Sequence, residues 1–341
     1  MDYISTWFCA DKEGEESNYA QTGEKSSSKK HQDIYWRCIV VFFISSKYQN
    51  PSKKHLLFTN VNKLPNVDGI DLNVLFQKLE IEIVYAAYKY KTPIGYYGAW
   101  RNQFYIFSVL EYIADNFKLE SNFLILDSDC VITKSTDSLF NDARLNGGFL
   151  SYIVEYGEQH VVNGISRRDM KIIYEDLYGG IISHVPEYHG GEFFLANVVN
   201  ITQIYKDFVN LWPILLERHN KEKIKFNEEA HTLSFLYFKN NLQGGGANSH
   251  IKRIWTNPVF YRNVLKDDVL LTIWHIPAEK TVGFKYLFGK FKDLDFNLTE
   301  NKFEFKKLIS KQFGIPNLTL GHKLMYYSLA YKKAIRKRLN F

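Results

Sequence analysis

The sequence predicts an α/β fold with a mixed, mainly parallel sheet flanked by helices. Strand-like and helix-like segments alternate over residues 3–126, and the 341 residues with 45% hydrophobic content can build a large core. Alternation at these lengths produces βαβ units with right-handed crossovers, whose parallel sheets are buried on both faces. Ligands in such sheets bind beyond the carboxyl ends of the strands. A site is therefore expected where the predicted strands end.

The first half of the chain carries the regular part of this pattern. "YISTWFC" (3–9) is aromatic and β-branched and predicts the first strand, which a polar loop follows up to residue 30. The next segment, "IYWRCIVVFFISSKYQ", is longer than usual strands, so we expect a helix with Asp33 as its N-cap. The other segments of this half are predicted as strands at 55–61, 81–88 and 122–126 and as helices at 71–79 and 96–117.

The second half is more irregular. Apolar segments lie at 147–156 and 188–199, helices are expected at 167–179, at 202–219 and from Asn227, and strands at 251–255 and 269–276. The part after Phe284 is rich in Lys and Phe, so we place a boundary there, with a catalytic domain over 1–283 and a C-terminal extension over 284–341.

Charge and cysteine content argue against a nucleic-acid-binding, secreted or membrane-spanning protein. The net charge of +6 comes largely from the C-terminus, where Lys332, Lys333, Arg336, Lys337 and Arg338 cluster, so a spread basic face for nucleic acid is not expected. Three scattered cysteines suit a reducing compartment, and no signal peptide or membrane span is recognised. We expect a cytoplasmic protein, with peripheral contact at the inner face of the membrane through the basic end and its tyrosines.

The stretch "NFLILDSDCVITKSTDSLF" (122–140) raises the main functional question, because a buried strand leads directly into Asp127 and Asp129. In an extended chain these two carboxylates point to the same side and repel each other. A divalent cation removes that penalty, and hard oxygen ligands suit Mg²⁺ or Mn²⁺. Acids also end strands without any metal. The second such pair, Asp293 and Asp295, follows no apolar strand, and we expect no site there.

The order of segments up to this acidic pair resembles the nucleotide-sugar-dependent glycosyltransferases of the GT-A fold, over roughly residues 3–280. In that family the first strand and its loop hold the nucleotide base. The resemblance therefore assigns the base to Thr6, Trp7, Phe8, Cys9 and Ala10. It also assigns Asp129 to the metal, Ser128 to the donor, and Asp127 to the metal or the donor. An ordinary buried strand explains the first five residues equally well.

Later segments resemble retaining members such as family 8. "YHGGEFFLAN" is similar to the segment that passes the donor sugar, which implies roles for Gly190 and Gly191, and "NEEAHTLSFLY" implies sugar contacts for Glu228 and Glu229. A plain turn and a helix-dipole effect are the alternatives. "WHIPAEK" resembles the segment with the last metal ligand and a phosphate-binding lysine. This implies His275 and Lys280, although the Pro-Trp after the lysine is missing and the spacing is one residue shorter.

The resemblance implies a glycosyltransferase of the hexosyl- or N-acetylhexosaminyltransferase type that uses Mn²⁺ or Mg²⁺ and a nucleotide-sugar donor, expected to be UDP-linked. Its acceptor would be a glycan or lipid-linked glycan, as in surface polysaccharide biosynthesis. Arg101 is similar to the basic residue that reaches the donor. An inverting reaction needs a carboxylate base, with Glu192 as first candidate and Glu228 or Glu229 next, whereas a retaining reaction needs none.

Two other classes stay open at this point. A sugar nucleotidyltransferase also combines an α/β sheet with acidic metal ligands, but it usually has a basic, Gly-rich loop after the first strand, where this chain has "DKEGEES". A non-catalytic member of the fold that binds a nucleotide or glycan is the other alternative.

Overall fold

The computed structural model describes residues 1–16, 19, 22–242, 244–297 and 302–339, without the side chains of 302, 303, 332–334 and 336–339. The chain divides into two compact units. Unit 1 comprises Met1–Asp33, Ser52–Ser128 and Thr136–Ser249, and unit 2 comprises Ile34–Pro51, Asp129–Ser135 and His250–Phe341. Each unit is thus assembled from separate stretches. The assignment of 1–283 as catalytic and 284–341 as an extension concerns function and stays a prediction.

Unit 1 is built on a six-stranded sheet in the order β5-β2-β1-β6-β9-β8. The strands are β1 (Asp2–Phe8), β2 (Lys54–Thr59), β5 (Ile81–Tyr85), β6 (Asn122–Leu126), β8 (Phe149–Ile153) and β9 (His189–Asn197). β5, β2, β1 and β6 pair in parallel, and β9 runs antiparallel to both β6 and β8. The predicted mixed, mainly parallel α/β sheet is confirmed. All five residues of β6 are buried, as expected for a central strand covered on both faces.

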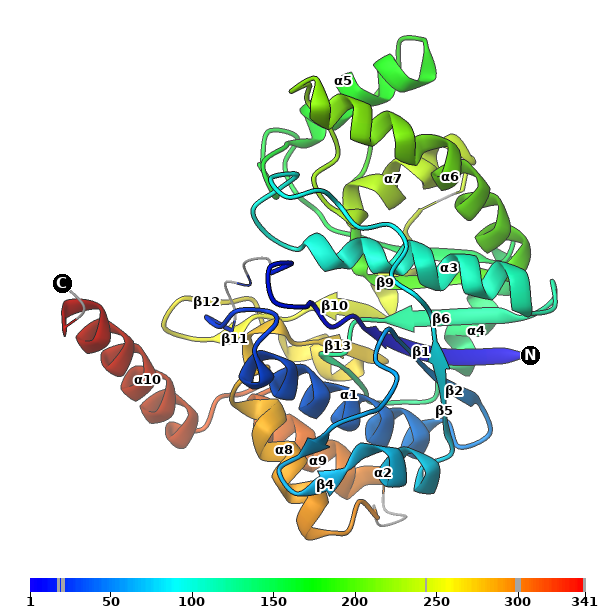
Figure 1. Cartoon of the computed structure of the whole chain (residues 1–341). Helices are drawn as coiled ribbons and strands as arrows, with labels where there is room; N and C mark the ends of the chain where they lie inside the picture. Colours follow the sequence, from blue (N-terminus) through cyan, green and yellow to red (C-terminus); the bar gives the residue numbers. More distant parts are fainter. Residues whose placement is uncertain (17–18, 20–21, 243, 298–301, 340–341) are drawn as a thin grey trace. The chain divides into compact units, whose positions relative to one another are not determined.

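Helices cover the sheet of unit 1. They are α2 (Leu72–Lys78), α3 (Tyr105–Asn116), α4 (Asp137–Leu145), α5 (Arg167–Tyr178), α6 (Val198–Asn220) and α7 (Glu229–Lys239), with short 3₁₀ turns η1 (Arg101–Phe104) and η2 (Ala247–Ser249) and a small hairpin, β3 (Asn66–Val67) and β4 (Ile70–Asp71). α3, α6 and α7 lie on the same face of the sheet (Figure 1). The rings of Phe107 in α3 and Phe208 in α6 stack with centroids 3.6 Å apart, which fixes these two helices together.

Unit 2 contains a three-stranded sheet in the order β10-β13-β7, made by β10 (Ile251–Arg253), β13 (Ile273–His275) and β7 (Cys130–Ile132). β10 and β13 are parallel, and β7 is antiparallel to β13. Its other elements are most of α1 (Lys29–Gln49), α8 (Gly283–Asp293), α9 (Lys302–Phe313), α10 (Leu320–Leu339), the hairpin β11 (Thr256–Asn257) and β12 (Tyr261–Arg262), and the turns η3 (Lys266–Leu270) and η4 (Pro277–Glu279). These labels are shown in Figure 1 where space allows.

Two predicted boundaries were wrong near residue 33 and residue 100. The first helix begins at Lys29 because the Ser28 hydroxyl accepts from the His31 amide at 3.2 Å and caps it, and Asp33 pairs with Lys29 inside the helix. The predicted helix 96–117 starts only with the 3₁₀ turn η1 at Arg101 and becomes α-helical at Tyr105, because Trp100 has a left-handed conformation with φ of 59°.

The predicted strand 269–276 was also too long, since the strand is limited to Ile273–His275. The preceding residues form the 3₁₀ turn η3 because the Asp268 carboxylate accepts from the Leu265 amide at 2.7 Å and closes that turn. The same carboxylate receives the ammonium of Lys252 at 3.0 Å.

The C-terminal helix α10 is fixed to unit 2 by a buried carboxylate. Glu279, 1% exposed, accepts hydrogen bonds from the hydroxyls of Thr256 and Tyr326, and burial raises its pKa. Tyr326 belongs to α10, so this contact holds the helix at its first turns. Among the described helices, including α10, none is long and apolar enough to cross a bilayer.

Candidate metal and nucleotide-sugar site

The acidic segment lies where the sequence places it, beyond the carboxyl end of β6. The chain leaves β6 at Leu126, passes through Asp127, Ser128 and Asp129, and enters β7 at Cys130. The amide of Asp127 donates to the Glu192 carbonyl of β9 at 3.1 Å, which holds the first aspartate against unit 1. Asp127 is partly exposed, whereas Ser128 and Asp129 are buried. The strand therefore delivers two carboxylates into different surroundings.

Asp129 is a buried anion of unit 2, with 1% of its surface exposed. His275 Nε2 lies 3.1 Å from its Oδ2, and the Lys280 ammonium donates to the same oxygen. Burial opposes the ionisation of Asp129, but the charges and hydrogen bonds of Lys280 and His275 outweigh it and hold the pKa of Asp129 below its ordinary value. Asp129 is thus an ionised carboxylate that a cation already accompanies.

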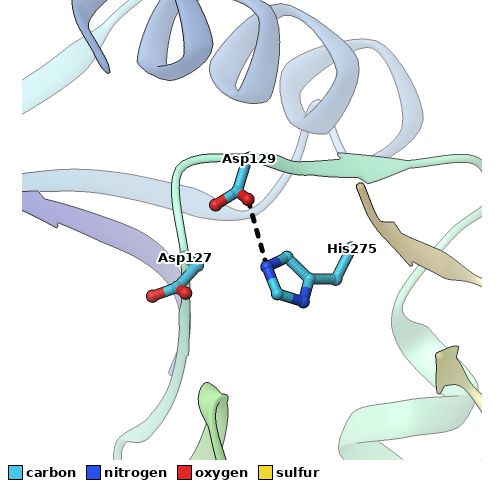
Figure 2. Close-up of side chains that lie close together, drawn as sticks. All are labelled: Asp127, Asp129 and His275. Carbon is cyan, nitrogen blue, oxygen red and sulfur yellow. Dashed lines mark hydrogen bonds and ion pairs between the residues drawn. The ribbon is translucent and has the colours of Figure 1, made fainter. Parts of the chain in front are cut away.

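Asp127, Asp129 and His275 each offer one ligand atom, and these atoms lie within 4.8 Å of one another (Figure 2). Two carboxylates and an imidazole nitrogen form a donor set that fits Mn²⁺ or Mg²⁺ and leaves positions for further ligands. The ammonium of Lys280 lies on Asp129 and 5.5 Å from the centre of the Tyr35 ring. The residues fit a divalent ion, which would share the Asp129 carboxylate with Lys280.

A second acidic cluster belongs to unit 1 and contains Glu192, Glu228 and Glu229, all buried. Burial raises the pKa of Glu229 well above its ordinary value, and the negative charges of Glu228, Asp127 and Glu192 add to the shift. The Gln103 side-chain amide, in the orientation that matches donors with acceptors, donates to the Glu229 carboxylate at 2.6 and 2.7 Å. Glu229 is therefore a candidate to hold a proton or to hydrogen-bond a hydroxyl.

The carboxylate of Glu228 is held by its own neighbours. It accepts from the Tyr188 hydroxyl at 2.8 Å and from the Asn163 amide, and His231 Nε2 lies 3.4 Å from it. Burial lowers the pKa of His231, which keeps that ring neutral. Glu228 is thus a fixed hydrogen-bond acceptor rather than a mobile one.

Gly190 and Gly191 in β9 make room for this acidic cluster. A Cβ at Gly190 would collide with the carboxylate of Glu192, and a Cβ at Gly191 with the carboxylate of Glu229. The sequence analysis attributes the small residues to close approach of a sugar. In the structure the space beside them holds two carboxylates, which places the predicted sugar contacts and the two glycines in one neighbourhood of unit 1.

The predicted base-binding residues form the end of β1 and the two positions after it. Thr6, Phe8 and Cys9 are buried, while Trp7 and Ala10 are partly exposed. The amide and carbonyl of Ala10 are hydrogen-bonded to the Asn60 side chain at 2.8 and 3.0 Å, so its backbone is already occupied. The Thr6 hydroxyl is buried without a hydrogen-bond partner among the described residues. Base binding by these five residues stays a prediction.

The sequence analysis did not single out Asp11, which the structure places beside the base-binding segment. Burial raises the pKa of Asp11 to about 6. The Ser26 hydroxyl, which donates to it at 2.6 Å, and the nearby charge of Arg101 lower the pKa and offset part of this effect. An acid shortly after the end of the first strand at Phe8 was the available signal. Within "DKEGEES", however, no local pattern distinguishes Asp11 from the acids that follow it.

Arg101 lies at the start of η1, with its guanidinium turned to two loops. It donates to the Thr92 carbonyl at 2.7 Å and to the Glu15 carbonyl at 3.4 Å, and its Nε is buried without a hydrogen-bond partner in the described part of the chain. Arg101 therefore holds the loop after β1, and its predicted contact with the donor stays a prediction.

No protein-family model and no curated protein sequence matches this chain. Its structure is similar to solved structures of glycosyltransferases, the class that the sequence resembles. An active-site mutant of LgtC has 12% identity and a TM-score of 0.48, over 90% of this chain and 100% of that one. Mouse xyloside xylosyltransferase 1 has 9% identity and a TM-score of 0.44, over 81% and 97%. Galactosyltransferase LgtC with donor and acceptor sugar analogues has 12% identity and a TM-score of 0.47. Similarity of this degree assigns no role to any residue, and the roles proposed below are argued from this chain.

The metal site gives a direct binding test. We expect Mn²⁺ to bind the purified protein in isothermal titration calorimetry, and Asp129→Asn to abolish that binding because it removes a buried anionic ligand. His275→Gln should weaken binding by about tenfold or more. Asp293→Asn is the matched control, because Asp293 belongs to the exposed second pair of aspartates. Equal Mn²⁺ binding by Asp129→Asn and Asp293→Asn would rule out this site.

The raised pKa of Glu229 predicts how stability depends on pH. The unfolded glutamate has a pKa of about 4.3, so above that value the native state retains a proton that the unfolded chain has lost. This contribution to stability is complete below the unfolded pKa and disappears as pH rises through the folded pKa. Glu229→Gln should therefore lose less stability than the wild type as pH rises from 5 to 8. Urea unfolding at several pH values measures the difference, and parallel curves for the two proteins would contradict it.

Proposed function

We propose that this chain is a metal-dependent glycosyltransferase that moves a sugar from a nucleoside diphosphate donor to a hydroxyl of a glycan or lipid-linked glycan. The observation that carries the proposal is the buried Asp129 in contact with both His275 and Lys280, two residues after Asp127. A site that offers hard metal ligands and a lysine ammonium side by side suits a pyrophosphate group, which needs a divalent ion and further positive charge. The donor is expected to be UDP-linked.

The proposed roles follow from the chemistry of each group. Asp129 and His275 hold the metal, and Asp127 shares it or binds the ribose or sugar. A bound divalent ion neutralises charge on the leaving diphosphate. Lys280 donates hydrogen bonds to that diphosphate from a buried position, where a preorganised charge stabilises more than it does in water. These are electrostatic roles, and they require no covalent step on the protein.

The carboxylates of unit 1 supply the remaining groups. Glu192 is the first candidate for a base if the reaction inverts the anomeric centre, with Glu228 and Glu229 next. The contacts of Glu228 with Tyr188 and Asn163 support a fixed acceptor for a sugar hydroxyl, and burial, which raises the pKa of Glu229, favours a protonated carboxyl that can donate a hydrogen bond. A retaining reaction would use these three residues to orient the sugar.

Release of nucleoside diphosphate from a panel of nucleotide sugars with Mn²⁺ tests the function. We expect turnover that stops with a chelator and returns with Mn²⁺, and a loss of about a hundredfold or more for Asp129→Asn, the scale of removing one electrostatic stabiliser. Asp293→Asn should retain the wild-type rate. Activity that survives both the chelator and Asp129→Asn would exclude the proposed mechanism.

A peripheral membrane contact belongs to this proposal because it suits a lipid-linked acceptor. In α10 the side chains of Tyr327 and Tyr331 are 60% and 69% exposed, and Leu329 is 41% exposed. The side chains of the neighbouring basic residues, Lys332, Lys333, Arg336, Lys337 and Arg338, lie outside the described part of the structure. Exposed aromatic residues beside clustered positive charge are typical of a surface that binds anionic lipid.

Vesicle pelleting tests the membrane contact with the full-length chain. We expect the wild type to pellet with vesicles that contain phosphatidylserine and to remain in solution with neutral vesicles. Replacement of all five basic residues by Gln should remove the binding, since each charge contributes about 1 kcal/mol near an anionic surface. Equal pelleting of the two proteins would refute the contact.

A further inference from the structure

The strand register of unit 2 places a further cation beside His275. β10 and β13 are parallel neighbours in which Arg253 pairs with His275, and His275 in turn pairs with Cys130 of β7. Arg253 and His275 are both the last residues of their strands, and Asp129 directly precedes β7. One row across the three strands therefore contains Arg253, His275 and Cys130. Neighbouring strands in a sheet are about 4.8 Å apart.

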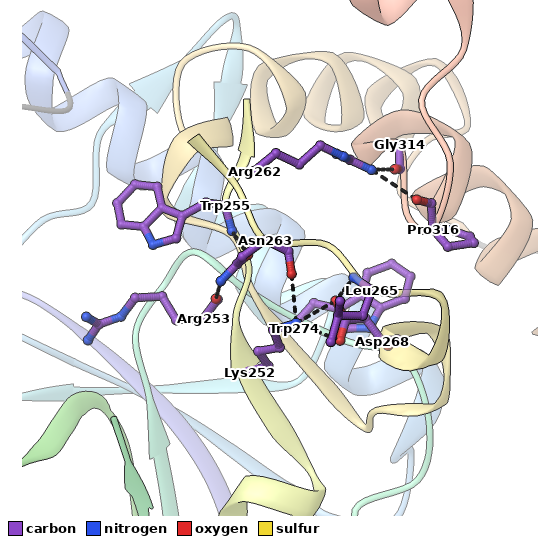
Figure 3. A network of polar contacts seen from close by, with 10 residues as sticks. All are labelled: Lys252, Arg253, Trp255, Arg262, Asn263, Leu265, Asp268, Trp274, Gly314 and Pro316. Carbon is purple, nitrogen blue, oxygen red and sulfur yellow. Dashed lines mark hydrogen bonds and ion pairs between the residues drawn. The ribbon is translucent and has the colours of Figure 1, made fainter. Parts of the chain in front are cut away.

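Residues that pair directly across neighbouring strands point to the same face, so Arg253 shares the face of His275. The preceding pair in the register, Lys252 and Trp274, points to the opposite face of the sheet. The Lys252 ammonium and the Trp274 indole both bind Asp268, at 3.0 and 2.7 Å. Figure 3 shows Lys252 turned toward Asp268 and Arg253 turned the other way. The two basic residues of β10 thus have different surroundings, and Arg253 is the one on the face of the metal ligand.

The backbone around Arg253 is held by the pairing with β13 and by Asn263. The Asn263 amide donates to the Arg253 carbonyl at 3.0 Å and accepts from the Trp255 amide at 2.8 Å. The Asn263 backbone amide also donates to the Trp255 carbonyl at 3.1 Å. These bonds continue the pairing beyond the end of β10 (Figure 3). Arg253 consequently leaves a fixed backbone, while its side chain is only partly buried.

We infer that Arg253 is a second cationic contact for the donor diphosphate, beside Lys280. This inference rests on the proposed function. A diphosphate presents several anionic oxygens, and Lys280 already donates to Asp129, so its ammonium is shared between that carboxylate and any phosphate. A guanidinium donates two parallel hydrogen bonds to phosphate oxygens, a geometry that an ammonium does not reproduce. Arg253 supplies such a fork next to the metal ligand His275, with its backbone already ordered before the donor binds.

Calorimetry with nucleoside diphosphates tests this inference separately from turnover. UDP, GDP and ADP are titrated in saturating Mn²⁺, and the tightest ligand is compared with its own nucleoside, measured by competition. Arg253→Gln should weaken diphosphate binding by about tenfold and leave nucleoside binding unchanged. Arg253→Lys keeps the charge but loses the fork, so its affinity should fall between those of Arg253→Gln and the wild type.

Lys285→Gln is the matched control, because it removes one positive charge from an exposed position of α8 in the same unit. It should bind both ligands like the wild type. Unchanged diphosphate affinity in Arg253→Gln overturns the role of Arg253, and so does an equal loss for diphosphate and nucleoside, which indicates a structural effect. If the wild type binds none of the three diphosphates, the proposed function fails and the inference fails with it.

Discussion

The candidate metal site depends on a carboxylate that is buried away from water. Asp129 has almost no exposed surface, and an isolated charge in that position would be strongly unfavourable. Two partners reduce this cost. Lys280, after the turn that follows β13, donates to the carboxylate, and His275, at the end of β13, contacts the same oxygen. Because each partner offsets part of the cost of burying the anion, the end of β13 and the turn after it both lie at this carboxylate. On the proposed function, a divalent ion would share the Asp129 carboxylate with Lys280.

The two units contribute different chemistry. Unit 1 gathers carboxylates whose mutual repulsion and burial raise proton affinity, as the pKa of Glu229 shows. Unit 2 gathers the positively charged and metal-binding groups, Lys280, His275 and, by our inference, Arg253. The segment Asp127–Ser128–Asp129 belongs to both, since its first two residues are counted with unit 1 and its last with unit 2.

Local patterns explain how much the sequence could predict. The apolar run of β6 followed by two aspartates predicts a strand end and a candidate metal-binding pair, because both signals lie within eight residues. His275 and Lys280 were found through a resemblance in one short segment. Asp11 and Arg253 were missed for different physical reasons. Asp11 required attention to a single acid in an acidic loop, whereas the position of Arg253 depends on which strands become neighbours, and no local pattern encodes that pairing. The helix starts near residues 33 and 100 depended on Ser28 and on the backbone of Trp100, which hydrophobic periodicity does not report.

The hydrogen bond from the Tyr326 hydroxyl to Glu279 limits which C-terminal truncations leave the fold intact. Basic, aromatic C-termini are natural candidates for removal when a protein adheres to membranes or columns. Here a cut before residue 326 would take away one of the two hydroxyls on Glu279, the residue next to Lys280, and leave a buried carboxyl short of a donor. A chain ended after residue 331 keeps that anchor while losing the basic cluster, and is the safer choice for crystallisation.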